Sequence, residues 1–217
     1  MNGFSIAPSA LAYLYGDLLQ DTFASSALVS FPESLPCRDV KVKKTDLATA
    51  ILVTGFVYLA KEDCLRLSIG SRGFLVKSKC VLVARTPCST GRQNGLEEQI
   101  LANLTGKAKD DCVNPIVQRV LRKDSVDPWG AVIREVQRYL LGLGYYAERE
   151  RQGVGKLLGK ELVPQCDKIL ALQAEVSKAH DMLASFRSAQ GELYVQLWKD
   201  AGAGITARQE TPDVDMA

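Results

Sequence analysis

Residues 153–156, Gly-Val-Gly-Lys, come closest to a motif that performs chemistry. A phosphate-binding loop needs glycines so that backbone N–H groups close around phosphate, and a lysine that reaches the outer oxygens. Here Glu150 replaces the upstream glycine, and Leu157 stands where Ser or Thr would hold magnesium. No apolar strand precedes the segment, so we interpret it as a flexible basic linker.

The candidate nucleophiles and metal ligands form no recognisable set. The single histidine, His180, is followed by Asp181, and both are expected on the polar face of a helix, where a solvated histidine is the ordinary role. The cysteines lie at irregular spacings without a C-x-x-C pair, which argues against zinc. We therefore expect no enzyme activity, metal or cofactor. The cysteines are Cys37, Cys64, Cys80, Cys88, Cys112 and Cys166.

The N-terminal sequence argues against export. Residues 1–19 lack the basic n-region and the uninterrupted apolar h-region of a secretory signal. We therefore expect a cytoplasmic, reducing location with free thiols, and peripheral membrane association as an alternative. The acceptor-like sequence at residues 103–105, Asn-Leu-Thr, has no meaning without export. The longest apolar run, residues 47–60, is too short for a transmembrane segment, which needs about 20 residues.

Charge is balanced over the whole chain but not along it. A net charge of +2 and a pI near 8.2 give no global attraction to nucleic acid or anionic membranes. Residues 1–36 contain no Lys or Arg, and basic residues concentrate between residues 37 and 85. We interpret the run at residues 38–44 as a solvated edge strand, with a surface for an anionic partner as the alternative. That surface would comprise Lys41, Lys43, Lys44, Lys77, Lys79 and Arg134.

A buried helix followed by a β-hairpin is the element around which the rest of the chain is expected to be organised. Residues 47–60 are almost all apolar and follow a capping pair, which predicts a core helix. Two alternating segments flank the turn sequence Gly-Ser-Arg-Gly at residues 70–73 and predict a hairpin. Helix then hairpin is the back half of a winged-helix unit. We predict one at residues 45–105, after an N-terminal helix and connecting segment at residues 1–44.

A second unit of the same kind is predicted at residues 112–152. Asp127 as N-cap and Pro128 at the first helical position begin the clearest amphipathic helix of the chain. A shorter helix before it and a tyrosine-containing segment after it repeat the order of helix, helix and wing. The expected fold is mostly α, of α+β class, with tandem winged-helix-like units. The residues expected to be buried are Ile51, Leu52, Trp129 and Ile133.

A heptad pattern predicts one long helix at residues 166–200. Seam residues step by three and four from Ile169 to Leu197, with Gln190 and Gly191 weakening the seam late, and the remaining positions are polar. Either the globular part of the chain or another helix must cover this seam. At about 1.5 Å per residue the helix would be about 40 Å long, longer than a small domain is wide. We therefore expect its end to project and contact a partner chain, before a disordered acidic tail at residues 201–217. The predicted contact residues are Phe186, Leu193 and Leu197.

The order of these elements resembles the core of the Golgi phosphoprotein 3 family over about residues 45–150. The shared features are the central helix, the hairpin, the Ser-Thr-Gly loop at residues 89–91, the helix at residues 96–104, and Asp-Pro-Trp leading into RYLLGLGYY. The resemblance implies a mostly helical peripheral membrane adaptor that recognises phosphatidylinositol 4-phosphate and holds glycosyltransferases in the Golgi. In this sequence Gly130 and Ile133 stand where that family has arginines.

Three functional hypotheses follow. The favoured one is a non-enzymatic adaptor or assembly subunit that docks to protein partners, or to itself, through residues 169–197. The second is a peripheral membrane protein that binds anionic phosphoinositide headgroups through the basic surface, at the Golgi if the resemblance holds. The third is a winged-helix nucleic-acid binder with salt-dependent affinity. Glu135 beside Arg134 and Arg138 mixes the charge of the candidate recognition helix and disfavours this third hypothesis.

Overall fold

Helices dominate the computed structural model, which describes residues 4–19, 32–72, 78–87, 95–106, 111–121, 126–151 and 160–209. Three antiparallel two-stranded hairpins complete this part of the chain, and the mostly helical α+β class is confirmed. The elements in chain order are α1 (Pro8–Leu19), β1 (Pro32–Ser34), β2 (Lys41–Lys43), α2 (Lys44–Lys61), β3 (Leu65–Arg72), β4 (Ser78–Arg85), α3 (Leu96–Ala102), α4 (Val113–Val120), α5 (Pro128–Gly142), β5 (Tyr146–Glu150), β6 (Lys160–Pro164), α6 (Cys166–Leu170), α7 (Gln173–Ala189) and α8 (Gly191–Thr206).

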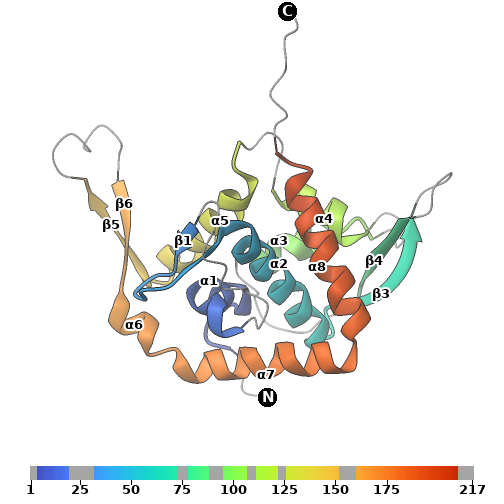
Figure 1. Ribbon diagram of the computed structural model, residues 1–217, viewed down its shortest axis with the longest axis horizontal. Helices are drawn as coiled ribbons and strands as arrows, with labels where there is room; N and C mark the ends of the chain where they lie inside the picture. The colour runs from blue at the N-terminus through green and yellow to red at the C-terminus, as the bar shows by residue number, and fades with distance from the viewer. Residues whose placement is uncertain are drawn as a thin grey trace, which may run out of the picture.

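Helix α2 is the central element, as predicted. It lies in the middle of the molecule and contacts α1, α3, α5, α7 and α8 (Figure 1). Asp46 in its first turn and Lys61 in its last turn complement the helix dipole. Ile51 and Leu52 are fully buried, and Ile133 of α5 is nearly so, which confirms three of the predicted core positions. Trp129 packs against the same core but is only partly buried.

The hairpin β3–β4 is confirmed, but its predicted turn is misplaced. Strand β3 continues to Arg72, and Gly70 pairs with Cys80 inside the ladder. A Cβ added at Gly70 would lie 2.4 Å from Leu82 Cδ1. The glycine therefore leaves room for the Leu82 side chain of the neighbouring strand. Gly70 was predicted to lie in the turn, but this glycine is needed for close packing between the two strands. The turn itself lies outside the described residues.

The order of helix then hairpin occurs twice, because β3–β4 follows α2 and β5–β6 follows α5. The second hairpin runs from Tyr146 to Pro164, further along the chain than the predicted unit. The Gly-Val-Gly-Lys segment between its strands lies outside the described residues. Buried residues of both predicted units belong to one hydrophobic cluster, so the two halves share a core.

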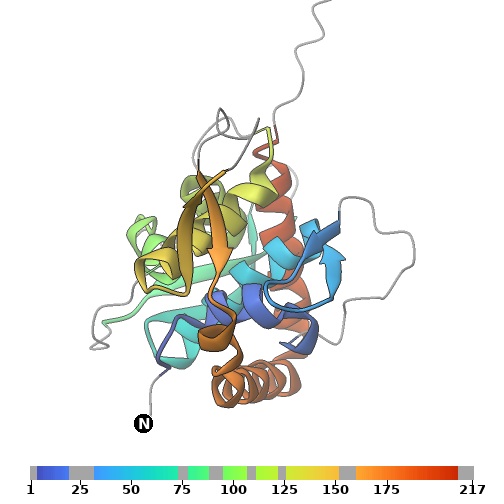
Figure 2. The same cartoon turned by 90° about the vertical axis from the view of Figure 1, so that its left-hand side faces the viewer.

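The prediction of one long C-terminal helix that projects from the body is wrong. The chain forms α6, α7 and α8, with a break between α7 and α8 at Gln190, whose φ of −141° and ψ of 50° are not helical. Helix α7 runs beneath the body against α1 and α2, and α8 turns back across α4, α2 and β4 (Figures 1 and 2). The chain's own body covers the apolar seam. The predicted partner contacts Phe186, Leu193 and Leu197 are therefore core residues, 4%, 7% and 0% exposed.

Helix α8 is held close to α4 and β4. Gly204 lies inside the helix, and a Cβ there would come within 2.8 Å of Val117 Cβ and 2.9 Å of Asn114 O. Only glycine permits this crossing. One turn earlier, the buried Asp200 accepts a hydrogen bond from Val81 N of β4 at 2.6 Å. The helix continues to Thr206, into the segment for which the sequence predicted a disordered tail.

The expectation of free thiols is wrong for three cysteines. Cys37, between β1 and β2, forms a disulfide with Cys166 at the start of α6, across 129 positions of sequence. Cys64 is also disulfide-bonded. Cys80 and Cys112 are free and buried. Irregular cysteine spacing excluded zinc but carried no information about which residues meet in space, since connectivity cannot be read from sequence.

Candidate functional site

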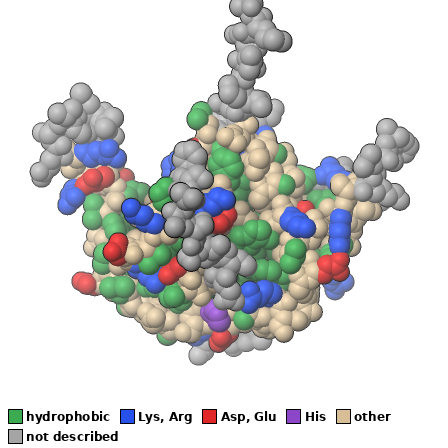
Figure 3. Space-filling model, viewed as in Figure 1, with side chains coloured by type: hydrophobic (Ala, Val, Ile, Leu, Met, Phe, Trp, Pro, Cys, Tyr) green, Lys and Arg blue, Asp and Glu red, His purple; other side chains and the backbone are tan. Residues whose placement is uncertain are grey.

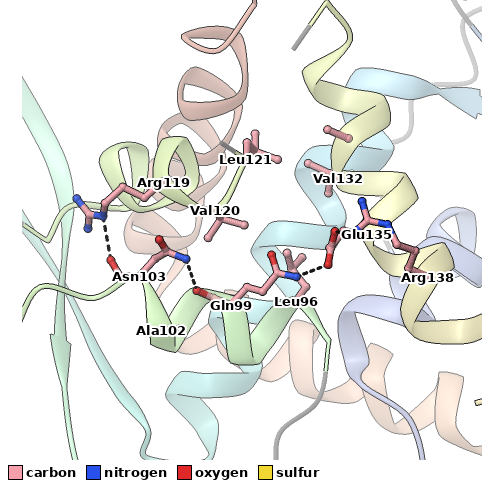
Figure 4. A pocket seen from close by; sticks show the side chains of 11 residues that line it. Leu96, Gln99, Ala102, Asn103, Arg119, Val120, Leu121, Val132, Glu135 and Arg138 are labelled. Atoms are coloured by element: carbon pink, nitrogen blue, oxygen red, sulfur yellow. Dashed lines mark hydrogen bonds and ion pairs between the residues drawn. The ribbon is translucent and has the colours of Figure 1, made fainter. Parts of the chain in front are cut away.

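A pocket of about 470 Å³ lies between α3, α4 and α5 (Figure 4). Its volume is within the range of about 300 to 1,000 Å³ that is typical of ligand-binding clefts. Six apolar residues line its floor and walls, and five polar residues surround them. The lining residues are Leu96, Ala102, Val120, Leu121, Ala131, Val132, Gln99, Asn103, Arg119, Glu135 and Arg138.

Local sequence places the three helices that form the pocket. Helix α5 begins at Asp127, whose side chain accepts a hydrogen bond from Gly130 N at 2.9 Å, with Pro128 at the first helical position. Helix α4 has a strongly amphipathic sequence and buries Ile116 and Val117. Helix α3 buries Leu96 and contacts α2. Because each helix buries its apolar stripe in the body, its polar residues remain at the rim.

The polar rim is ordered by contacts among its own residues. The side-chain amide of Gln99 on α3 donates to Glu135 on α5, and Arg138 forms an ion pair with the same carboxylate. On the other side, Arg119 Nε donates to Asn103 O at 2.9 Å (Figure 4). These contacts join α3 to both of its neighbours. The rim is therefore positioned before any ligand arrives.

The buried carboxylate of Asp111 holds Arg119 at the pocket. Asp111 is 2% exposed, and its Oδ1 lies 2.8 Å from Arg119 Nη2. The same carboxylate accepts hydrogen bonds from Thr105 N at 2.9 Å and Gly106 N at 3.1 Å. One acidic side chain thus closes the loop after α3 and orients a guanidinium of α4. Nothing in the sequence pattern distinguished Asp111 from the neighbouring polar residues.

The lining of the pocket combines apolar side chains with charged groups that can bind a ligand. Among the described residues that line the pocket, none carries a hydroxyl, thiol, imidazole or amine. Its one carboxylate, Glu135, is already engaged by Gln99 and Arg138. Two guanidinium groups stand above an apolar floor, and guanidinium groups bind carboxylates and phosphates in a planar, bidentate manner. A ligand that combines an apolar group with an anionic group fits this chemistry.

No family model, curated protein or solved structure matches the chain. In the part of the chain that the structure describes, no helix is long and apolar enough to cross a membrane. The same residues contain no cluster of His, Cys, Asp or Glu that would hold a metal ion.

The predicted basic surface is divided in two. Lys44 and Arg134 converge on Asp127, with Nζ and Nη1 at 2.5 and 3.8 Å from Oδ2, and the exposed Lys41 and Lys43 lie on the adjoining strand β2. Lys79 lies on β4, at the other side of the molecule (Figure 1). It forms an ion pair with Glu192 of α8. Lys77 lies outside the described residues.

Acidic residues offset the positive charge around Lys44. Burial alone would raise the pKa of Asp127, but the Lys44 ammonium, the Gly130 N–H and Arg134 lower it below its ordinary value. Glu33 faces the same lysine, and burial raises its pKa despite the lysine's attraction, with Asp127 adding to the rise. Figure 3 shows Lys and Arg side chains scattered beside Asp and Glu over the viewed face, without one continuous basic field.

Glu97, next to the pocket residue Leu96, provides a pH-dependent test of the fold. Its carboxylate is 1% exposed and accepts from Ser9 N at 3.0 Å and Ser9 Oγ at 2.8 Å. Burial raises the pKa of Glu97, although the Ser9 hydrogen bonds oppose the rise. A carboxyl with a raised pKa in the folded state stabilises the fold at low pH, and this stabilisation is lost as pH rises through the folded pKa.

We expect Glu97→Gln to flatten the pH dependence of the free energy of unfolding above about pH 4.3, the ordinary glutamate pKa. The amide stays neutral and keeps an acceptor for Ser9, so the variant should gain on the parent chain as pH rises. Urea unfolding at a series of pH values measures this. Glu98→Gln, at an exposed position of the same helix, is the matched control and should follow the parent curve. Parallel curves for both variants would contradict the assignment.

Proposed function

We propose that the chain is a non-enzymatic binding protein, an adaptor or assembly subunit, that docks a protein partner at the pocket between α3, α4 and α5. The observation that carries this proposal is an apolar floor beneath a rim of pre-positioned guanidinium groups. Arginine is enriched at protein interfaces and in their energetic hot spots. A pocket with this lining accepts an anchor side chain and fixes its neighbours by charge.

The partner segment carries an apolar side chain flanked by Asp or Glu. The guanidinium groups of Arg119 and Arg138 line the pocket, and each also pairs with a carboxylate, Asp111 and Glu135 respectively. Guanidinium N–H donors at the rim favour an acidic segment over a basic one, and such complementarity supports specificity and a fast association rate. The apolar floor supports burial of the anchor at about 25 cal/mol per Å² of apolar surface.

The phosphoinositide hypothesis is the second candidate, since a headgroup phosphate and a carboxylate share affinity for guanidinium. Of the basic residues first assigned to it, Lys44 and Arg134 converge on Asp127, Glu33 faces Lys44, and Lys79 pairs with Glu192, which reduces their net charge. The pocket instead places two guanidinium groups beside an apolar floor, which suits an apolar anchor side chain better than a headgroup. We therefore favour the protein partner and treat the lipid as an outcome of the test.

Charge reversal at Arg138 tests the proposal. Peptides selected from a random displayed library against the immobilised chain should combine an apolar residue with Asp or Glu. Their affinity, measured by fluorescence anisotropy, should fall about tenfold or more in Arg138→Glu, because a charge-assisted hydrogen bond contributes about 1.5 to 3 kcal/mol and about 1.4 kcal/mol is tenfold. Arg149→Glu is the matched control, since Arg149 is 69% exposed, Arg138 is 67% exposed, and each pairs with one glutamate.

Selected peptides that bind Arg138→Glu and Arg149→Glu equally would contradict docking at this pocket. Failure to select any acidic peptide, together with flotation of the chain on phosphoinositide vesicles that is lost in Arg138→Glu, would favour the lipid headgroup instead. A salt-dependent mobility shift with nucleic acid that both variants weaken equally would favour a nonspecific electrostatic surface.

A further inference from the structure

Two buried cysteines meet beside the hairpin β3–β4. Cys80 on β4 and Cys112 just before α4 are 8% and 1% exposed, and their sulfur atoms are 2.9 Å apart. A disulfide bond is about 2.05 Å long, so a small side-chain movement separates this contact from a covalent bond. No other role of the two thiols is evident, because neither lines the pocket between α3, α4 and α5.

The backbone brings Cys112 to the edge of β4, diagonally across from Cys80 and two residues along the strand. The segment that contains Cys112 runs antiparallel to β4, with a bridge between Leu82 and Cys112. Val83 N donates to Asp111 O at 2.7 Å, next to this bridge. Asp200 of α8 fixes the same strand through Val81 N. Backbone pairing and helix packing therefore hold the two segments side by side, and the two cysteine side chains reach each other diagonally.

We propose that Cys80 and Cys112 form a further structural disulfide, and that the chain folds and works in an oxidising compartment. The first support is geometric, as described above. The second is that Cys37 and Cys166 are already joined and Cys64 is also disulfide-bonded. Several structural disulfides in one domain are typical of secreted or lumenal proteins and rare in the reducing cytosol.

The bond forms by thiol–disulfide exchange with a disulfide oxidant, such as glutathione disulfide or the disulfide of an oxidoreductase. One cysteine thiolate attacks the oxidant, a mixed disulfide forms, and the first oxidant thiol leaves. The second cysteine then attacks the mixed disulfide, which releases the second thiol. The two cysteines lose two electrons and two protons in total, and the oxidant takes up both to become two thiols.

The burial of the pair assigns it a structural role rather than that of a reversible switch. Burial, followed by the neighbouring Cys112 and Asp200, raises the pKa of the Cys80 thiol to about 12. Exchange requires a thiolate and access to it, and the folded chain offers neither at this position. Oxidation therefore takes place while the chain is still open during folding, and the folded protein then protects the bond.

Peptide mapping tests the proposal on the full chain. The protein is refolded with a mixture of reduced and oxidised glutathione, unfolded in the presence of an alkylating reagent, digested and analysed by mass spectrometry. We expect a cross-linked peptide pair that joins Cys80 to Cys112, and no alkylation at either residue. Cys80→Ala is the control, in which Cys112 should become fully alkylated. Alkylation of both cysteines in protein that contains the Cys37–Cys166 bond would overturn the proposal.

A second measurement separates a covalent bond from packing. Glutathione added to the native protein should reduce the Cys37–Cys166 bond first, because Cys166 is exposed, and leave Cys80–Cys112 intact. The double variant Cys80→Ala/Cys112→Ala should melt about 5 to 15 °C below the parent, and most of this difference should vanish in strong reductant, where neither protein has the bond. A difference of the same size with and without reductant would show that the two thiols only pack.

Discussion

Phe186→Ala is expected to lower the free energy of unfolding by about 3 to 5 kcal/mol, the usual cost of truncating a buried phenylalanine. Phe186 is 4% exposed near the end of α7 and lines the same pocket as Ala60 of α2 and Leu65 of β3. Loss of its ring leaves a cavity where α7, α2 and β3 meet, just before the break at Gln190. A loss of this size is a large part of a stability of about 5 to 15 kcal/mol.

Urea denaturation followed by circular dichroism measures this effect. Val195→Ala on α8 is the control, because Val195 is 53% exposed, and exposed substitutions usually change stability by less than about 0.5 kcal/mol. If Phe186→Ala kept full stability but lost association with another chain, Phe186 would belong to an interface, as the sequence alone suggested.

Asp111→Ala is expected to cost about 3 to 5 kcal/mol as well. The substitution leaves the N–H groups of Thr105 and Gly106 without their acceptor and removes the partner of Arg119. Each buried donor left unpaired costs about 1 to 3 kcal/mol, and removal of one partner of a buried charge pair costs about 3 to 5 kcal/mol. The partial exposure of Arg119, 32%, places the ion-pair contribution below that upper range.

The measurement compares Asp111→Ala with Asp181→Ala, whose parent side chain is 84% exposed on α7. Thermal unfolding should show a marked loss for the first variant and almost none for the second. Because Asp111 orients Arg119, the fraction of Asp111→Ala that remains folded should also bind acidic peptides more weakly. Equal stability of the two variants would mean that the loop after α3 does not depend on this carboxylate.

Local patterns predicted the elements whose causes are local. The apolar run of α2 and the Asp127-Pro128 start of α5 are confirmed, because a long apolar stretch and an N-cap followed by proline act within a few residues. The break at Gln190 was missed, although Gln190 and Gly191 interrupt the apolar seam, because apolar residues resume in the same heptad register at Leu193 and Leu197. Heptad spacing shows which apolar side chains must be buried. It does not show whether another chain or the body of the same chain buries them.

Long-range contacts explain why the candidate site was not predicted. Gln99 reaches Glu135 across 36 positions, and Arg119 reaches Asn103 across 16. Each of these residues has an ordinary polar position in its own helix. Only the packing of α3 between α4 and α5 gives them a shared pocket. The expected basic surface failed for the same reason, because Lys44 and Lys79 face different elements and already have acidic partners.

The disulfide between Cys37 and Cys166 also determines how the molecule transmits mechanical force. It spans 129 positions and closes most of the body, from β2 to β6, into a covalent ring that excludes α1, α7 and α8. Tension applied to the two termini passes directly through the sulfur atoms and bypasses everything inside the ring. About 450 Å of extended chain, at roughly 3.5 Å per residue, therefore stays out of reach of a pulling force. Only the segments outside the ring, among them α1, α7 and α8, can be extended, and α2 and the pocket helices stay within the covalent ring.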